Sequence, residues 1–436
     1  MKPITHTYLP NPLISKLASI KLHDVNLFLI FILAPVADNL TGFLLFKDIL
    51  VSDSNSISPS IILRLGIMGI SMAYLKKGIQ FNSIVIFIIY IIFLELLSFF
   101  VIHHNPTGIF VGLNWSTKII YAMMLGLFLF NMVKDGVLTF ESLLLRFRTT
   151  VIIYALVIFI PFWFGIGNPT YGRYSQTFGK MGFLANGNGA GTLQGIGSIV
   201  SLYIFMSKKT LKNFLLYLLN LSTCYIIATK GTMLYTLINA LLWFWHARFH
   251  IKLLAITAIA FVFSQLSSNI LYTVFKSYDV IRYRYERAPD FFSFLFSGRD
   301  LYLSNAIENY NINDFASLRL LSGFGAFTSF RNTGYSFSST QSRYFLEAEM
   351  FDMFFMYGFI GWFLYMSFFF VTLILSIRNR RFHYFLPWGL CWFYSMFAGH
   401  MLFNGMSILA IMVLFNLIIQ PTQKDCLYDR YNYLKK

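Results

Sequence analysis

Residues 82–102 read NSIVIFIIYIIFLELLSFFVI, an almost unbroken apolar run with one charged residue, Glu95. The hydrocarbon core of a bilayer is about 30 Å thick, which an α-helix crosses in roughly 20 apolar residues. Backbone amides and carbonyls must be paired inside lipid, and a helix pairs them within the segment itself. The run therefore predicts a transmembrane helix, and the bilayer is expected to determine the fold.

Similar runs recur along the whole chain. Of its 436 residues, 57% are hydrophobic and 12% are charged, whereas a soluble domain has roughly 25% charged residues. Apolar runs and polar breaks predict an all-α polytopic membrane protein with about twelve transmembrane helices. They are expected at 25–46, 60–75, 82–102, 113–133, 149–168, 184–207, 212–229, 231–247, 251–272, 347–375, 384–399 and 401–420. No small-residue cleavage site follows the first run, which is expected to act as a signal anchor.

The predicted spans divide the chain into four parts. Nine helices lie in 1–272, a large outer loop covers 273–346, three helices lie in 347–420, and 421–436 forms a tail. When both termini are placed in the cytoplasm, 20 of the 34 Lys and Arg residues fall on the inner side. This distribution follows the positive-inside rule and predicts a multi-pass protein of the bacterial inner membrane. The net charge of +16 then reflects topology and does not indicate nucleic-acid binding.

Several classes of site are not indicated by the sequence. It has no CxxC, no HExxH and no phosphate-binding GxxxxGK[ST] pattern, so neither zinc chemistry nor ATP-driven transport is predicted. Two of the three cysteines, Cys224 and Cys391, fall in predicted spans, and Cys426 falls in the tail. We therefore expect a protein without a metal or another cofactor.

The basic residues of loop 273–346 are unusual because seven are Arg and one is Lys. On the predicted inner side Lys outnumbers Arg thirteen to seven, although either residue satisfies the topology rule. The planar guanidinium can bind phosphate or carboxylate with two parallel hydrogen bonds, which an ammonium cannot do. Aromatic residues are interleaved with these Arg residues and could pack on sugar rings. A simpler alternative is that both residue types lie at the membrane interface.

Three carboxylates, Glu347, Glu349 and Asp352, open the tenth predicted span. Charged groups are costly in a membrane unless they face water, a partner or a substrate. On a helix, residues 349 and 352 would share a face. A helix dipole favours acidic residues in the first turn, which would explain one or two of the three. A metal site is less favoured, because no His or further acidic residue is near in the sequence.

The pattern Glu347-x-Glu349-x-x-Asp352, followed by Gly358 and Gly361, resembles the acidic signature of O-antigen and capsular polysaccharide polymerases in the O-antigen ligase-like superfamily. Related ligases have a His-Asn pair where this chain has Glu347. That difference favours a polymerase over a ligase.

Further motifs extend the resemblance over roughly 170–365. Ser297-Gly298-Arg299 resembles the Gly-Arg motif, with a helix expected over 301–310, and Leu321 to Gly325 resembles a Gly-x-Gly turn. Lys230 lies in Thr229-Lys-Gly-Thr232, where many members have Ser-Arg-Gly. Residues 182–188 resemble the Asn-containing entry to a central helix.

The resemblance implies a C-type glycosyltransferase that moves a growing glycan from undecaprenyl diphosphate to the next lipid-linked repeat unit. It implies membrane lipids and a chain-length regulator as further partners. Arg299 and Lys230 would stabilise the diphosphate leaving group, because preplaced cationic donors stabilise developing negative charge. Glu347 would be the general base. Supporting and substrate-binding residues would be Arg173, Lys180, Asn188, Arg343, Glu349 and Asp352.

Two alternatives remain open. An O-antigen ligase would use a lipid A-core acceptor, and a flippase would transport lipid-linked oligosaccharide. Transporters often contain internal repeats, but halves 1–210 and 211–420 share only hydropathy.

Four polar residues in or near the spans have more ordinary interpretations. Arg64 is expected to snorkel to the surface. Glu95 either forms a buried pair with Lys118 or Arg64, or has a functional role. His400 and Asn404 are expected to be polar groups that pack between helices.

The Lys and Arg distribution predicts the topology, which reporter fusions can test. Fusions after residues 55, 108 and 310 should report the outer side, and fusions after 79, 210 and 380 the inner side. An inner-side signal at 310 would contradict an outer-face reaction.

Overall fold

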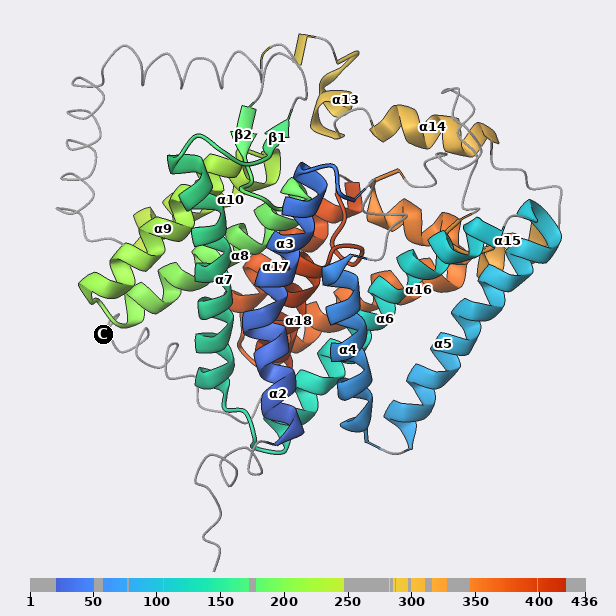
Figure 1. Ribbon diagram of the computed structural model, residues 1–436, viewed down its shortest axis with the longest axis horizontal. Helices are drawn as coiled ribbons and strands as arrows, with labels where there is room; N and C mark the ends of the chain where they lie inside the picture. The colour runs from blue at the N-terminus through green and yellow to red at the C-terminus, as the bar shows by residue number, and fades with distance from the viewer. Residues whose placement is uncertain are drawn as a thin grey trace, which may run out of the picture.

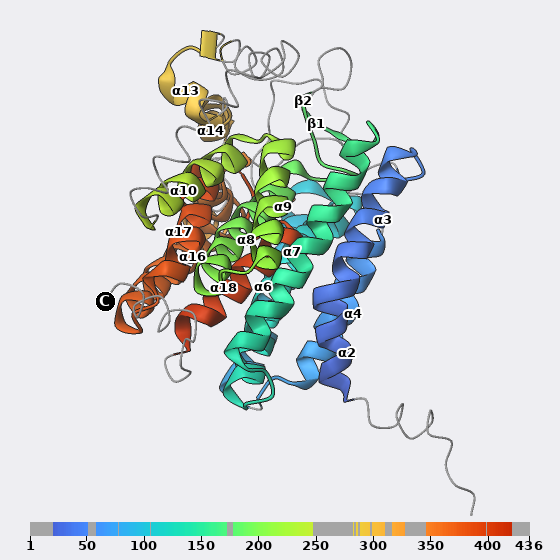
Figure 2. The ribbon, with the colours of Figure 1, turned by 90° about the vertical axis from the view of Figure 1, so that its left-hand side faces the viewer.

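The computed structural model describes residues 21–50, 58–76, 78–104, 106–171, 178–246, 282, 285–286, 288–296, 299–309, 316–327, 346–397 and 399–420. Helices account for 81% of them. Two short strands, β1 (Pro169–Tyr171) and β2 (Phe178–Lys180), pair antiparallel as a hairpin. Figures 1 and 2 show a bundle of long helices, with this hairpin and two short helices, α13 and α14, at one end, here called the loop end.

The helices follow one another with short connections for most of the chain. In order they are α2 (Leu22–Phe28), η1 (Leu29–Leu33), α3 (Ala34–Phe46), α4 (Pro59–Ala73), α5 (Ile79–Ser98), η2 (Phe99–His103), α6 (Pro106–Lys134), α7 (Phe140–Trp163), α8 (Gly187–Ser207), α9 (Leu211–Ile227), α10 (Lys230–His246), α13 (Phe291–Phe296), α14 (Arg299–Asn309), α15 (Ala316–Ser322), α16 (Glu349–Arg378), α17 (Phe382–Phe397) and α18 (Gly405–Ile419). The helix expected over 301–310 is confirmed as α14.

Helices occupy eleven of the twelve predicted spans, and the twelfth, 251–272, lies outside the described residues. Among the described residues, six helical stretches are long and apolar enough to cross a membrane: Leu22–Phe46, Ile79–Val101, Gly108–Lys134, Phe140–Trp163, Gly187–Ser207 and Glu349–Arg378. Helices α4, α9 and α18 are apolar but shorter. The structure is that of an all-α membrane protein, and twelve crossings stay a prediction.

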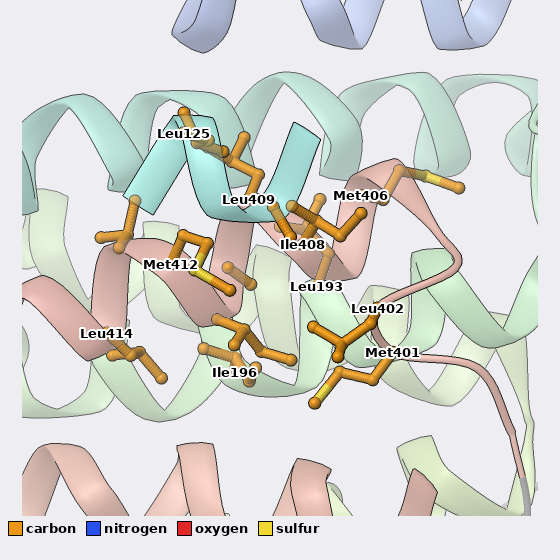
Figure 3. Close-up of a cluster of buried hydrophobic side chains, with 14 of the residues drawn as sticks. Leu125, Leu193, Ile196, Met401, Leu402, Met406, Ile408, Leu409, Met412 and Leu414 are labelled. Atoms are coloured by element: carbon orange, nitrogen blue, oxygen red, sulfur yellow. The ribbon is translucent and has the colours of Figure 1, made fainter. Parts of the chain in front are cut away.

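Helix α18 lies at the centre of the bundle. Nearly all its side chains are buried, and it packs against α6, α8, α16 and α17. Figure 3 shows Leu409 and Met412 of α18 between Leu125 of α6 and Leu193 and Ile196 of α8. A helix that is apolar on every side is expected in such a position, because it has no face for water.

Helix α8 is joined to its neighbours by buried polar side chains. The Gln194 amide donates to the Val151 carbonyl oxygen of α7 (3.0 Å), and its oxygen accepts from the Thr223 hydroxyl of α9 (3.0 Å). The Asn239 amide of α10 donates to the Ser198 hydroxyl (2.8 Å). Helices in lipid associate through such bonds and close packing, because apolar burial does not favour a neighbouring helix over lipid.

Helix α16 is broken at Tyr357 and Gly358, where Gly358 has φ 61° and ψ −160°. The turn after α15 packs into this break, and the Gly325 amide donates to the Met356 carbonyl oxygen (2.9 Å). The Tyr90 hydroxyl donates to the Ser322 carbonyl oxygen (3.0 Å). Irregular backbone is tolerated in a membrane protein where it is buried against protein. The expected Gly-x-Gly turn is present, with positive φ at both glycines, and it packs against a membrane helix.

Glu95 is fully buried beside this turn. Its Oε1 accepts from the Ala326 amide (2.7 Å) and the Ser116 hydroxyl (3.3 Å). Arg64, offered as its partner, instead forms an ion pair with Asp38 (2.6 Å). The expectations that Arg64 snorkels or pairs with Glu95 are wrong, because its guanidinium is turned to the Asp38 carboxylate on α3.

Gly358 provides a test of the broken helix. A Cβ atom at this residue would lie 2.6 Å from the Gly323 amide nitrogen and the Leu321 carbonyl oxygen. Gly358→Ala should therefore lower the free energy of unfolding by about 1–3 kcal/mol, the usual range for backbone strain. Gly69→Ala is the control, because its Cβ would have no neighbour within 4 Å. Thermal unfolding in detergent measures the stability of both variants. Equal unfolding midpoints would contradict close packing of the α15 turn against the break at Gly358.

Candidate functional site

The chain enters α16 through an unusual turn. Glu347 has φ 58°, in the left-handed region that residues other than Gly rarely adopt. Its carbonyl oxygen accepts from the Gly399 amide (2.6 Å), and Ala348 and Gly399 form a parallel bridge. The entry to α16 is thus joined to the segment between α17 and α18. The helix begins at Glu349, two residues later than predicted.

Glu349 and Asp352 are fully buried and bind backbone amides. Glu349 Oε1 accepts from the amides of Met401 (2.7 Å) and Leu402. Asp352 accepts from the amides of Leu346 (2.7 Å) and Ala348 (3.1 Å). Neither side chain reaches the surface, and both accept hydrogen bonds from loop amides, which gives them a structural role; that they bind substrate stays a prediction. Together they hold the segments on either side of Glu347.

Glu347 is the exposed member of the acidic group, with 43% of its side chain accessible. Its Oε2 accepts from Arg299 Nη2 at 2.6 Å, across 48 positions of sequence. The Arg299 side chain is 12% exposed, and its Nη1 donates to the Phe296 carbonyl oxygen (3.3 Å). Its Nε is buried and has no acceptor within the described residues. The structure thus joins two of the three predicted catalytic residues.

Lys230, the third predicted catalytic residue, also contacts α13. Its ammonium donates to the Phe294 carbonyl oxygen and lies 4.2 Å from the centre of the Phe294 ring. Lys230 and Arg299 therefore bind carbonyls two residues apart at the end of the same short helix. The Phe296 ring packs against Phe397 of α17 (5.3 Å), which anchors α13 to the bundle.

His400 connects the acidic turn to α6. Its ring lies 5.7 Å from that of Trp115, and its Nε2 lies 3.8 Å from Asp352 Oδ2. Burial lowers the pKa of His400 to about 4, so its imidazole is neutral at pH 7. Lys118 Nζ lies 3.7 Å from the centre of the Trp115 ring. The sequence did not indicate Trp115, because α6 is distant in the chain and only tertiary packing brings it here.

Of the remaining predicted site residues, the structure describes Lys180 and Asn188. The Lys180 ammonium donates to the Gly167 carbonyl oxygen (3.3 Å) within the hairpin region. Asn188 lies in the first turn of α8 and is partly buried. Arg173 and Arg343 lie outside the described residues. Among the described residues, no three His, Cys, Asp or Glu side chains lie together as a metal site would require.

A cavity of about 470 Å³ opens between α5, α6, α16, α17 and α18. Its lining is almost entirely apolar and includes Ile119, Met353, Trp392 and Leu402. Met353 follows Asp352 in the chain, and Leu402 lies two residues after His400. One end of the cavity is therefore adjacent to the segments that hold Glu347.

No protein-family model, curated protein or solved structure significantly matches this chain.

The buried carboxylates can be tested by stability. Glu349→Leu would leave the amides of Met401 and Leu402 without their acceptor, at roughly 1–3 kcal/mol for each buried group. We expect a large fall in the unfolding midpoint of the purified protein. Glu347→Gln is the matched control and should change stability little, because its side chain is half-exposed. Equal falls in the unfolding midpoint of the two variants would contradict a structural role for Glu349 that Glu347 does not share.

Proposed function

We propose that this protein polymerises lipid-linked oligosaccharide repeat units, as an O-antigen or capsule polymerase at the outer face of the bacterial inner membrane. Both termini would be cytoplasmic, and the fold would be of the C-type glycosyltransferase kind. The observation that carries the proposal is the Arg299–Glu347 contact (2.6 Å). It unites a carboxylate suited to accept a proton with a guanidinium suited to a diphosphate, at the entry to a membrane helix.

In the proposed reaction, a hydroxyl oxygen of the incoming repeat unit attacks the anomeric carbon of the growing chain. The hydroxyl proton passes to the Glu347 carboxylate. The bond from the anomeric carbon to the diphosphate oxygen breaks, and both electrons leave with undecaprenyl diphosphate. Arg299 stabilises that charge, because a guanidinium has five N–H donors and its buried Nε has no acceptor within the described residues. Lys230, which contacts α13, would add positive charge.

The apolar cavity is consistent with a lipid-linked donor. Ligand sites in proteins commonly measure about 300–1,000 Å³, and this cavity of about 470 Å³ is bounded by membrane helices. A polyprenyl tail inserted there would place its diphosphate near the entry to α16. The carrier would supply the energy of transfer, so no nucleotide site is required.

The Glu347→Gln variant distinguishes a catalytic role of Glu347 from a structural one. Loss of a general base typically lowers the rate about 10²–10⁴-fold, whereas loss of a helix-terminal charge costs roughly 0.3–1 kcal/mol of stability and little rate. Glu347→Gln should express normally and bind lipid-linked substrate but stop chain growth, measured as polymer length in a deletion strain.

Arg299→Lys should also lose most activity, because the charge remains while the fork geometry is lost.

Long polymer from both variants would refute the assignment. The deletion strain also separates the alternatives: single repeat units on the lipopolysaccharide core support a polymerase, whereas long polymer accumulated on the lipid carrier would indicate a ligase.

A further inference from the structure

A second pocket, polar and small, lies between α3, α4, α6, α8 and α18. Its volume is about 60 Å³, and its lining includes Asp38, Arg64, Lys118, Asn186 and Asn404. A buried water needs roughly 10–15 Å³ of such volume, so this pocket holds about four to six water-sized groups. A phosphate group has five heavy atoms, so its size fits.

The lining of the pocket contains two basic side chains and one acidic side chain. Arg64 Nη2 donates to both Asp38 oxygens (2.6 and 2.8 Å), and the Tyr154 hydroxyl also donates to Asp38 (2.5 Å). Lys118 is a second cation on the lining. Arg64 Nε is buried and has no acceptor in the part of the chain that the structure describes. This donor would be satisfied by an anion in the pocket.

Two helix N-termini meet at the same pocket. Asn186 caps α8 by accepting from the Gly189 amide (2.9 Å), and Asn404 caps α18 by accepting from the Met406 amide (3.0 Å). A Cβ atom on Gly189 would overlap the Asn404 carboxamide, so the two ends are in close contact. A Cβ atom on Gly405 would overlap the Arg64 guanidinium, which places that group against the start of α18. Positive helix ends favour anions.

We propose that this pocket binds a phosphate group carried by a membrane lipid. Three of the contributing helices, α3, α6 and α8, belong to elements long and apolar enough to cross a membrane. The lining also includes apolar side chains, Ile61, Phe403 and Met406. A polar pocket among such helices is reached most directly by an anion whose carrier lies in the bilayer.

The pocket is separate from the Arg299–Glu347 pair but adjoins its surroundings. Lys118 packs on Trp115, and the Trp115 ring contacts those of His400 (5.7 Å) and Phe403 (5.5 Å). If the proposed function holds, two lipid diphosphates must be bound at once, one on the donor and one on the acceptor. The pocket would hold one phosphate group of the diphosphate that Arg299 does not bind, and this assignment rests on the proposed function.

Binding to full-length protein carrying Arg299→Gln tests the pocket without the Arg299 site. Farnesyl diphosphate, inorganic diphosphate and farnesol serve as probes, with equilibrium binding in neutral detergent as the measurement. Farnesyl diphosphate should bind more tightly than inorganic diphosphate, and farnesol should bind weakly. Equal affinity for the two diphosphates would overturn the lipid part of the proposal.

A second binding measurement uses variants of the pocket in the protein that carries Arg299→Gln. Lys118→Gln removes one cation, and Gly405→Ala displaces the Arg64 guanidinium without changing charge. Each should weaken farnesyl diphosphate binding about tenfold or more, as expected for loss of a charge-assisted contact. Gly66→Ala, on the same helix as Arg64 and with no neighbour within 4 Å of its Cβ, should bind normally.

Wild-type affinity in both pocket variants would overturn the site. Long polymer from the Glu347→Gln variant would contradict the proposed function alone. The binding measurement would still test the pocket, because it requires no turnover.

Discussion

The entry to α16 depends on two buried carboxylates that accept hydrogen bonds from backbone amides. Glu349 binds two amides of the segment between α17 and α18, and Asp352 binds two amides of the chain just before its own helix. A buried charge is costly unless it is hydrogen-bonded, and a buried amide is costly without an acceptor. Each group therefore stabilises the other. The arrangement fixes three segments at once and holds Glu347 outside the helix.

The same arrangement occurs again at the break in α16. There Glu95, on α5, accepts from the Ala326 amide and so supports the turn that packs against Gly358. The entry to α16 and the break within it thus each have an acidic side chain beside them. Buried acidic residues in membrane helices commonly mark functional sites, but these three have a structural explanation. Of the three acidic residues at the entry to α16, only Glu347 has a substantially exposed side chain.

The sequence predicted the helices well because apolar runs of about 20 residues reflect the thickness of the bilayer directly. Residue type and the family resemblance also indicated Arg299 and Glu347 as candidate catalytic residues, and the structure places these two side chains in contact. The sequence did not separate the roles of the three carboxylates, because helical spacing cannot reveal which loop amides meet Glu349 or Asp352. The partners of Arg64, Glu95 and Lys118 were likewise unpredictable, since each depends on the packing of helices distant in the chain.

In the proposed reaction, the contact between Arg299 and Glu347 links two events. While Glu347 is ionised, its charge balances the guanidinium at 2.6 Å. When Glu347 accepts a proton, that balance is lost, and the full positive charge of Arg299 becomes available to another anion. The diphosphate gains its negative charge during the same step, so acceptor deprotonation and leaving-group stabilisation would reinforce each other. Bound substrate that excludes water from the site would strengthen this coupling, because electrostatic interactions are stronger at low dielectric. A preformed ion pair is therefore compatible with catalysis here, provided that the proton moves to Glu347 as the bond to the diphosphate breaks.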